Sequence, residues 1–82
     1  MINIVFFAQL REQLKSDGLT LTIATPCTVA DVQQAVLKKH PQWRDFLANP
    51  ALMCALNQDI VPLDAQVLDG NEVAFFPPVT GG

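Results

Sequence analysis

The residues best suited to chemistry close the printed sequence, which ends Pro77-Pro78-Val79-Thr80-Gly81-Gly82. Glycine has no side chain, so a Gly-Gly pair can pass through a channel that any Cβ would block. The carboxylate of Gly82 is unhindered but is a poor electrophile, so reaction there requires activation, normally as an acyl-adenylate made from ATP. An activating enzyme can then attach sulfur, which gives a thiocarboxylate, or pass the acyl group to a thiol.

The residues before the glycines form a spacer. Proline cannot donate a ladder hydrogen bond, so we expect strand pairing to end at Pro77. Residues 79–82 reach ~13–14 Å when extended, and the reach from Pro77 is ~20 Å. That length suffices to enter a pocket on another protein. We therefore predict a folded domain over 1–77 and a flexible C-terminal tail over 78–82, whose Pro78, Val79, Thr80 and Gly81 insert into a partner.

The other reactive side chains give weaker signals. Cys27 and Cys54 lie far apart without a zinc-type spacing, so we predict two reduced cysteines that behave as small hydrophobes, and no metal site. His40 follows a predicted helix and is expected to be a capping or solvent residue. No nucleophile–base pair is evident, which places the catalytic groups on a partner protein.

Size and charge limit the remaining functions. The chain has 82 residues, 50% of them apolar and 16% charged, which is enough for one packed domain. A domain of this size cannot hold both a deep cavity and a full core, so a self-contained large enzyme is excluded. Five basic residues against eight acidic ones argue against nucleic-acid binding. With neither a signal peptide nor an apolar run of ~20 residues, we expect a cytoplasmic protein with no membrane contact.

The elements that must position the tail begin with two strands. Residues 2–8 are β-branched and aromatic and predict a strand. Its parity puts Ile2, Ile4 and Phe6 on one face and Asn3, Val5 and Phe7 on the other, which the polar Asn3 marks as the less buried face. A short amphipathic helix is expected over 9–16, closed by Asp17-Gly18 with Gly18 in the left-handed conformation. Residues 19–25 alternate apolar and polar side chains, which predicts a half-buried antiparallel strand.

The main helix and the remaining strands follow. Thr28 and Asp31 form a capping-box pattern, and the helix that they start ends before Pro41. Residues 42–48 predict a short helical turn. The later strands are expected over 51–57, at 60–61 and over 72–76, and residues 64–69 read as a loop.

This order predicts an α+β fold, the ubiquitin-like β-grasp, in which one main helix packs on one face of a mixed sheet. The first and last strands then run parallel in the middle of the sheet. Phe7 and Phe76 would share the face away from the helix, next to the polar residues Asn3 and Glu72, and Ile60 would join them. Apolar residues on a partly solvated face mark an interface, so we predict that Phe7, Ile60 and Phe76 form a docking patch.

Four stretches of the sequence resemble one known family. EVAFFPPVTGG (72–82) is similar to the C-terminus of the small subunit of molybdopterin synthase, the MoaD-type sulfur carrier. INIVFFAQLRE (2–12) resembles the first strand and following turn of that family. ALNQDIV (55–61) and LDGNEV (68–73) resemble its middle strands and the turn before the last strand. The length also agrees with the family.

This resemblance implies a function. An adenylating enzyme related to ubiquitin-activating (E1-like) enzymes would use ATP to activate the Gly82 carboxylate, and a sulfurtransferase system would convert it to a thiocarboxylate. The carrier would dock on the large catalytic subunit of molybdopterin synthase and give sulfur to cyclic pyranopterin monophosphate, within a heterotetramer. The chain would thus be the sulfur-donating subunit of a sulfurtransferase and would bind no cofactor itself.

Three other functions are compatible with the same residues. The chain can be a sulfur carrier for thiamine synthesis or tRNA thiolation, with the same chemistry at Gly82 and another acceptor. It can be a ubiquitin-like protein modifier, with Gly82 joined to a lysine. It can also be a binding module whose tail takes no part in chemistry.

Overall fold

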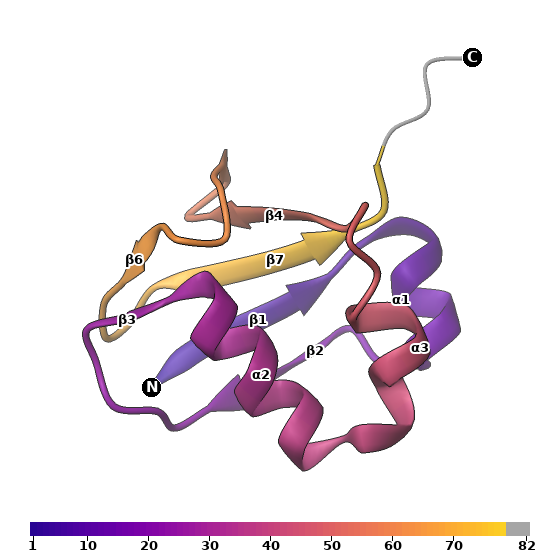
Figure 1. Cartoon of the computed structure of the whole chain (residues 1–82), viewed down its shortest axis with the longest axis horizontal. Helices are drawn as coiled ribbons and strands as arrows, with labels where there is room; N and C mark the ends of the chain where they lie inside the picture. The colour runs from indigo at the N-terminus through magenta and orange to yellow at the C-terminus, as the bar shows by residue number, and fades with distance from the viewer. Residues whose placement is uncertain (79–82) are drawn as a thin grey trace.

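A five-stranded mixed sheet organises the molecule, as the computed structural model shows for residues 1–78 (Figure 1). Its strand order is β2-β1-β7-β4-β5. The central strands β1 and β7 run parallel, and β2, β4 and β5 each pair antiparallel with a neighbour. The strand bounds are Ile2–Phe6 (β1), Gly18–Leu21 (β2), Met53–Leu56 (β4), Asp59–Ile60 (β5) and Glu72–Phe76 (β7). The predicted β-grasp fold, with its parallel central pair, is confirmed.

The helices lie to one side of this sheet (Figure 1). The longest, α2, crosses the face of the sheet, and α1 and α3 lie near the end where β1 and β7 finish. Their bounds are Ala8–Leu14 (α1), Val29–Lys39 (α2), Pro41–Trp43 (the 3-10 helix η1) and Arg44–Leu47 (α3). The α1 helix and the helical turn predicted over 42–48 are thus both present.

The core fills the space between the sheet and α2. Ile2, Ile4 and Phe6 alternate with more exposed neighbours along β1 and are at most 1% exposed, which confirms the predicted parity. Trp43 packs edge-on against Phe6, with ring centroids 5.4 Å apart. The main helix contributes its valine stripe, and β7 contributes alternate residues to the same core: Val29, Val32, Val36, Val73 and Phe75.

A capping box starts α2 as predicted. The backbone N–H of Asp31 donates to Oγ1 of Thr28 at 3.1 Å, and the backbone N–H of Thr28 donates to Oδ2 of Asp31 at 3.0 Å. These two bonds satisfy backbone donors that the first turn of a helix leaves free. At the other end, the N–H of His40 donates to the carbonyl of Val36 before Pro41 opens the 3-10 helix η1.

The predicted role of Gly18 is wrong. Lys15, at φ 54°, closes α1 in the left-handed conformation. Gly18 is instead the first residue of β2, opposite Val5 of β1. A Cβ at Gly18 would lie 2.0 Å from the carbonyl oxygen of Ile4, so the glycine is required by close strand packing rather than by a helix end.

A second, two-stranded sheet was not predicted. It pairs β3 (Cys27–Thr28) with β6 (Gln66–Val67), which lies within the expected loop 64–69. Two residues a strand are too few to give a periodic pattern in the sequence. Strand β2, expected to continue to residue 25, ends at Leu21, because its partner Ile2 is the first residue of β1.

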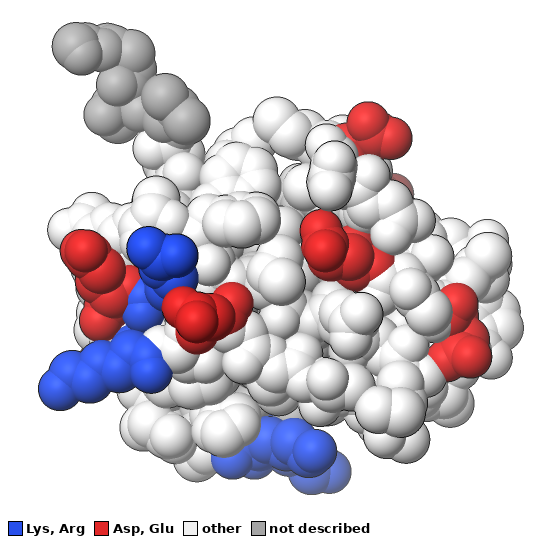
Figure 2. All heavy atoms as spheres, turned by 180° about the vertical axis from the view of Figure 1, so that it is seen from behind, with Lys and Arg blue, Asp and Glu red and all other residues white. Residues whose placement is uncertain are grey.

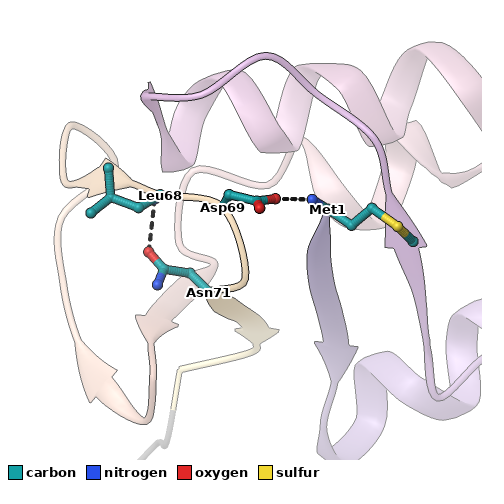
Figure 3. A network of polar contacts seen from close by, with 4 residues as sticks. All are labelled: Met1, Leu68, Asp69 and Asn71. Carbon is teal, nitrogen blue, oxygen red and sulfur yellow. Dashed lines mark hydrogen bonds and ion pairs between the residues drawn. The ribbon is translucent and has the colours of Figure 1, made fainter.

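Polar contacts join the start of β1 to the turn before β7 (Figure 3). The ammonium group of Met1 contacts the carboxylate of Asp69, and the N–H of Gly70 donates to the carbonyl of Met1 at 2.8 Å. Within the turn, the N–H of Leu68 donates to Oδ1 of Asn71 at 2.8 Å. The two central parallel strands are therefore tied together where they begin.

This contact predicts a pH dependence. The hydrogen bond from the Met1 ammonium, and then its positive charge, lower the pKa of Asp69. A carboxyl whose pKa is lower folded than unfolded (about 3.9) stabilises the protein above that value, and the contribution is lost as the pH falls through the folded pKa. We expect the Tm of Asp69→Asn to fall less than the Tm of the parent as the pH is lowered from about 5. The effect is small because both groups are largely exposed, and parallel Tm curves would contradict it.

Candidate functional site

The base of the tail lies at the end of the sheet where β1 and β7 finish (Figure 1). The last β7 residue is Phe76; Pro77 is half-buried and Pro78 is exposed. The N–H of Phe7 donates to the carbonyl of Phe75 at 3.3 Å, which extends the β1–β7 pairing one step past β1. The predicted tail residues Val79, Thr80, Gly81 and Gly82 lie outside the described residues, and the division at 77/78 stays a prediction.

The face of the sheet opposite α2 carries the predicted docking residues, and we call it the outer face. Strand register arranges it in rows, because paired residues point to the same side. One row runs across four strands: Val5, Ala74, Ala55 and Ile60. The next row, toward the tail, pairs Phe76 with Met53, and Phe7 continues β1 into that row.

These rows bring the three predicted residues to one face. Phe7 is 49% exposed, Ile60 is 66% exposed and Phe76 is half-buried. Phe7 and Phe76 are neighbours across the parallel pair, whereas Ile60 lies two strands from β7, in the row of Ala74. Between them the two alanines Ala55 and Ala74 are 6% and 2% exposed, although they lie outside the core cluster. Larger neighbours on the outer face therefore cover them.

Met53 is a residue of this face that sequence reasoning missed. It stands opposite Phe76 on β4 and is half-buried. A methionine can adapt its shape to different partners. The parity of β4 could have identified it, because Met53 alternates with the buried Cys54. We take Phe7, Met53, Ile60 and Phe76 together as the candidate docking patch.

Charged groups leave most of the outer face free (Figure 2). The five strands of this sheet contain no lysine or arginine, and their only acidic residues are Asp59 and Glu72. The basic residues lie on or next to the helices: Arg11, Lys15, Lys38, Lys39 and Arg44. Asp59 lies in the row of Leu56 and the core residue Val73, so Glu72 is the acidic strand residue of the outer face.

The two cysteines and His40 pack against other parts of the domain. Cys54 is 4% exposed and its thiol donates to the carbonyl of Val61 at 3.1 Å. Burial raises the pKa of the Cys54 thiol, and burial followed by the charge of Asp31 raises that of Cys27. His40 stacks on Trp43 with ring centroids 4.2 Å apart. A raised pKa disfavours the reactive thiolate, so these thiols are poorly suited to act as nucleophiles.

Residues 1–78 contain no group of three His, Cys, Asp or Glu side chains able to hold a metal ion. No helix in the same part of the chain is long and apolar enough to cross a membrane.

Comparison with known proteins identifies the family. The model of the ThiS family matches residues 4–82. The chain belongs to the ThiS family. It is 42% identical to the molybdopterin synthase sulfur carrier subunit of Escherichia coli and 40% identical to that of Haemophilus influenzae, and each alignment covers the whole of both chains. The resemblance to molybdopterin synthase small subunits is confirmed.

Solved structures agree with the fold. The crystal structure of SAMP1 from Haloferax volcanii matches with a TM-score of 0.80 and 26% identity, over 99% of this ThiS-family chain and 98% of that one. A complex of molybdopterin-converting factor subunits 1 and 2 from Helicobacter pylori matches with a TM-score of 0.68 and 22% identity, over 99% and 97%. The second likeness is a likeness of fold.

Proposed function

We propose that this chain is a sulfur carrier in molybdopterin biosynthesis. The observation that carries the proposal is the similarity to two molybdopterin synthase sulfur carrier subunits at 42% and 40% identity over all 82 residues. The ThiS-family match over residues 4–82 supports it. The sequence adds a Gly81-Gly82 ending next to a β-grasp domain.

Adenylation and sulfur attachment both take place at the carboxylate of Gly82. A carboxylate oxygen attacks the α-phosphorus of ATP on an E1-like adenylating enzyme, pyrophosphate leaves, and an acyl-adenylate forms. A sulfide equivalent (HS⁻) delivered by a sulfurtransferase system then attacks the acyl carbon and displaces AMP, which gives the Gly82 thiocarboxylate and releases a proton. A thiocarboxylate is ionised at neutral pH and nucleophilic through sulfur, so it stores sulfur in a form ready for transfer.

The acceptor is cyclic pyranopterin monophosphate in the active site of the large subunit of molybdopterin synthase. The docking patch on the outer face binds that subunit, and Pro78, Val79, Thr80 and Gly81 carry Gly82 into its pocket. The tail leaves β7 directly beside Phe76, so docking and insertion involve adjoining parts of the chain. The same patch serves the adenylating enzyme, and catalytic side chains come from the partners.

Protein modification is a second candidate, and one observation favours it. Two solved structures with the same fold, at 26% and 24% identity, are of SAMP1. The second of them is named small archaeal modifier protein 1. In that function Gly82 would end in an isopeptide bond to a lysine of a target protein. Thiamine and tRNA thiolation remain alternative destinations for the sulfur.

Mass spectrometry of the intact chain purified from cells separates carrier from modifier. A carrier is expected to gain the mass that accompanies exchange of one oxygen for sulfur, located at Gly82 by fragmentation. Conjugates in which Gly82 is bonded to target lysines, with no such exchange, would contradict the carrier function and support modification.

A further inference from the structure

A hollow of about 400 Å³ lies on the outer face beside the docking patch. Strands β1, β2 and β7 form it, and the pairing of these strands explains its position. Asn3 pairs with Thr20 on one side and with Glu72 on the other, and Val5 pairs with Gly18. These five residues all line the hollow.

Gly18 lines the hollow and adds no side chain to it. On the outer face of β2, the position opposite Val5 is empty, so Val5 forms an apolar floor. No other residue fits at Gly18 without a shift of the backbone, since a Cβ would lie 2.0 Å from the carbonyl oxygen of Ile4. Close packing of β1 and β2 therefore fixes Gly18 as one wall of the hollow.

The charge at the hollow is negative. Glu72 and Asp17 line it, and no lysine or arginine does. Asp17 has Nε of Arg11 3.8 Å from its Oδ1, with both side chains exposed. Within residues 1–78 the carboxylate of Glu72 has no ion-pair partner, although its backbone N–H bonds to Oδ1 of Asn57 at 2.9 Å.

We propose that a lysine or arginine side chain of the large subunit enters this hollow and pairs with Glu72. The inference rests on the proposed function, since it requires a protein docked on the outer face. The hollow continues the docking patch, because Val5 lies in the same row as Ala74, Ala55 and Ile60. A long basic side chain can lay its methylene stem on Val5 and present its charge to the carboxylate.

The test compares Glu72→Gln with Asp64→Asn by calorimetric titration of each purified chain with purified large subunit at low and high salt. Both variants remove one negative charge, but exposed Asp64 does not line the hollow. We expect Glu72→Gln to weaken binding about fivefold at low salt, with the difference shrinking as salt rises. Asp64→Asn is expected to change affinity by less than about twofold.

A third variant, Asn3→Lys, places a cation directly opposite Glu72 on the neighbouring strand. It should weaken binding at least as much as Glu72→Gln, because the hollow is then occupied from within the chain. Circular dichroism checks that each variant is folded. Equal affinities for Glu72→Gln and Asp64→Asn would overturn this inference alone, whereas failure of the unaltered chain to bind the large subunit would overturn the proposed function as well.

Discussion

Deletion of Gly82 is expected to abolish sulfur transfer and leave the fold unchanged. The deleted residue carries the carboxylate that is adenylated in the proposed mechanism, and the new terminal carboxylate of Gly81 falls ~3.3–3.6 Å short of the old position. A misplacement of about 1 Å already costs on the order of 100-fold in rate when reacting groups must be aligned. We therefore expect activity at least 100-fold below that of the parent.

The measurement is molybdopterin formed per minute with purified partners, at saturating concentrations of the large subunit. Among residues 1–78 the last core residue is Phe75, well before Gly82 in the sequence, so thermal unfolding should be unchanged. Asp64→Asn is the control, because it leaves the tail unchanged and Asp64 is exposed outside the docking patch. Retention of activity by the deletion variant would favour a binding module with an uninvolved tail.

Phe76→Ala is expected to weaken binding to the large subunit by about 30-fold, or about 2 kcal/mol. Phe76 ends the last strand, directly before the tail, and pairs with Met53 in the row that Phe7 continues. An aromatic residue at the centre of an apolar patch is the kind that dominates binding energy. Removal of its ring also deprives both neighbours of a contact in the complex.

Titration of the purified chains measures this effect. Leu68→Ala is the control, since Leu68 is 51% exposed and follows β6, away from the rows of the outer face. It should leave affinity within about twofold. Phe76 lies outside the core cluster, so its truncation should not prevent folding. Equal affinities for the two variants would contradict the assignment of the docking patch.

The sequence predicted the central architecture because its signals are periodic. Alternation placed Ile2, Ile4 and Phe6 in the core, and the capping box marked the start of α2. Parity alone put Phe7 and Phe76 on one face. The pairing of Phe6 with Phe75, and the bond from the N–H of Phe7 to the carbonyl of Phe75, agree with that placement. Their function in docking stays a prediction.

What could not be predicted depends on contacts between distant segments. The β3–β6 sheet brings Cys27 to Val67, and neither two-residue strand has a pattern of its own. The local sequence predicts that Gly18 ends a helix. In the structure a glycine is needed there because the carbonyl of Ile4, on the neighbouring strand, lies too close for a side chain. The hollow beside Glu72 is lined by residues of β1, β2 and β7, so it could not be found before these strands were paired.

The central claim is that sulfur held at Gly82 becomes the sulfur of molybdopterin. The direct test mixes this chain, carrying a verified thiocarboxylate, with the purified large subunit and cyclic pyranopterin monophosphate, without other sulfur sources. Molybdopterin should form in proportion to the thiocarboxylate consumed, and the chain should return to its carboxylate mass. Binding to the large subunit without molybdopterin formation, with the thiocarboxylate unspent, would contradict the claim.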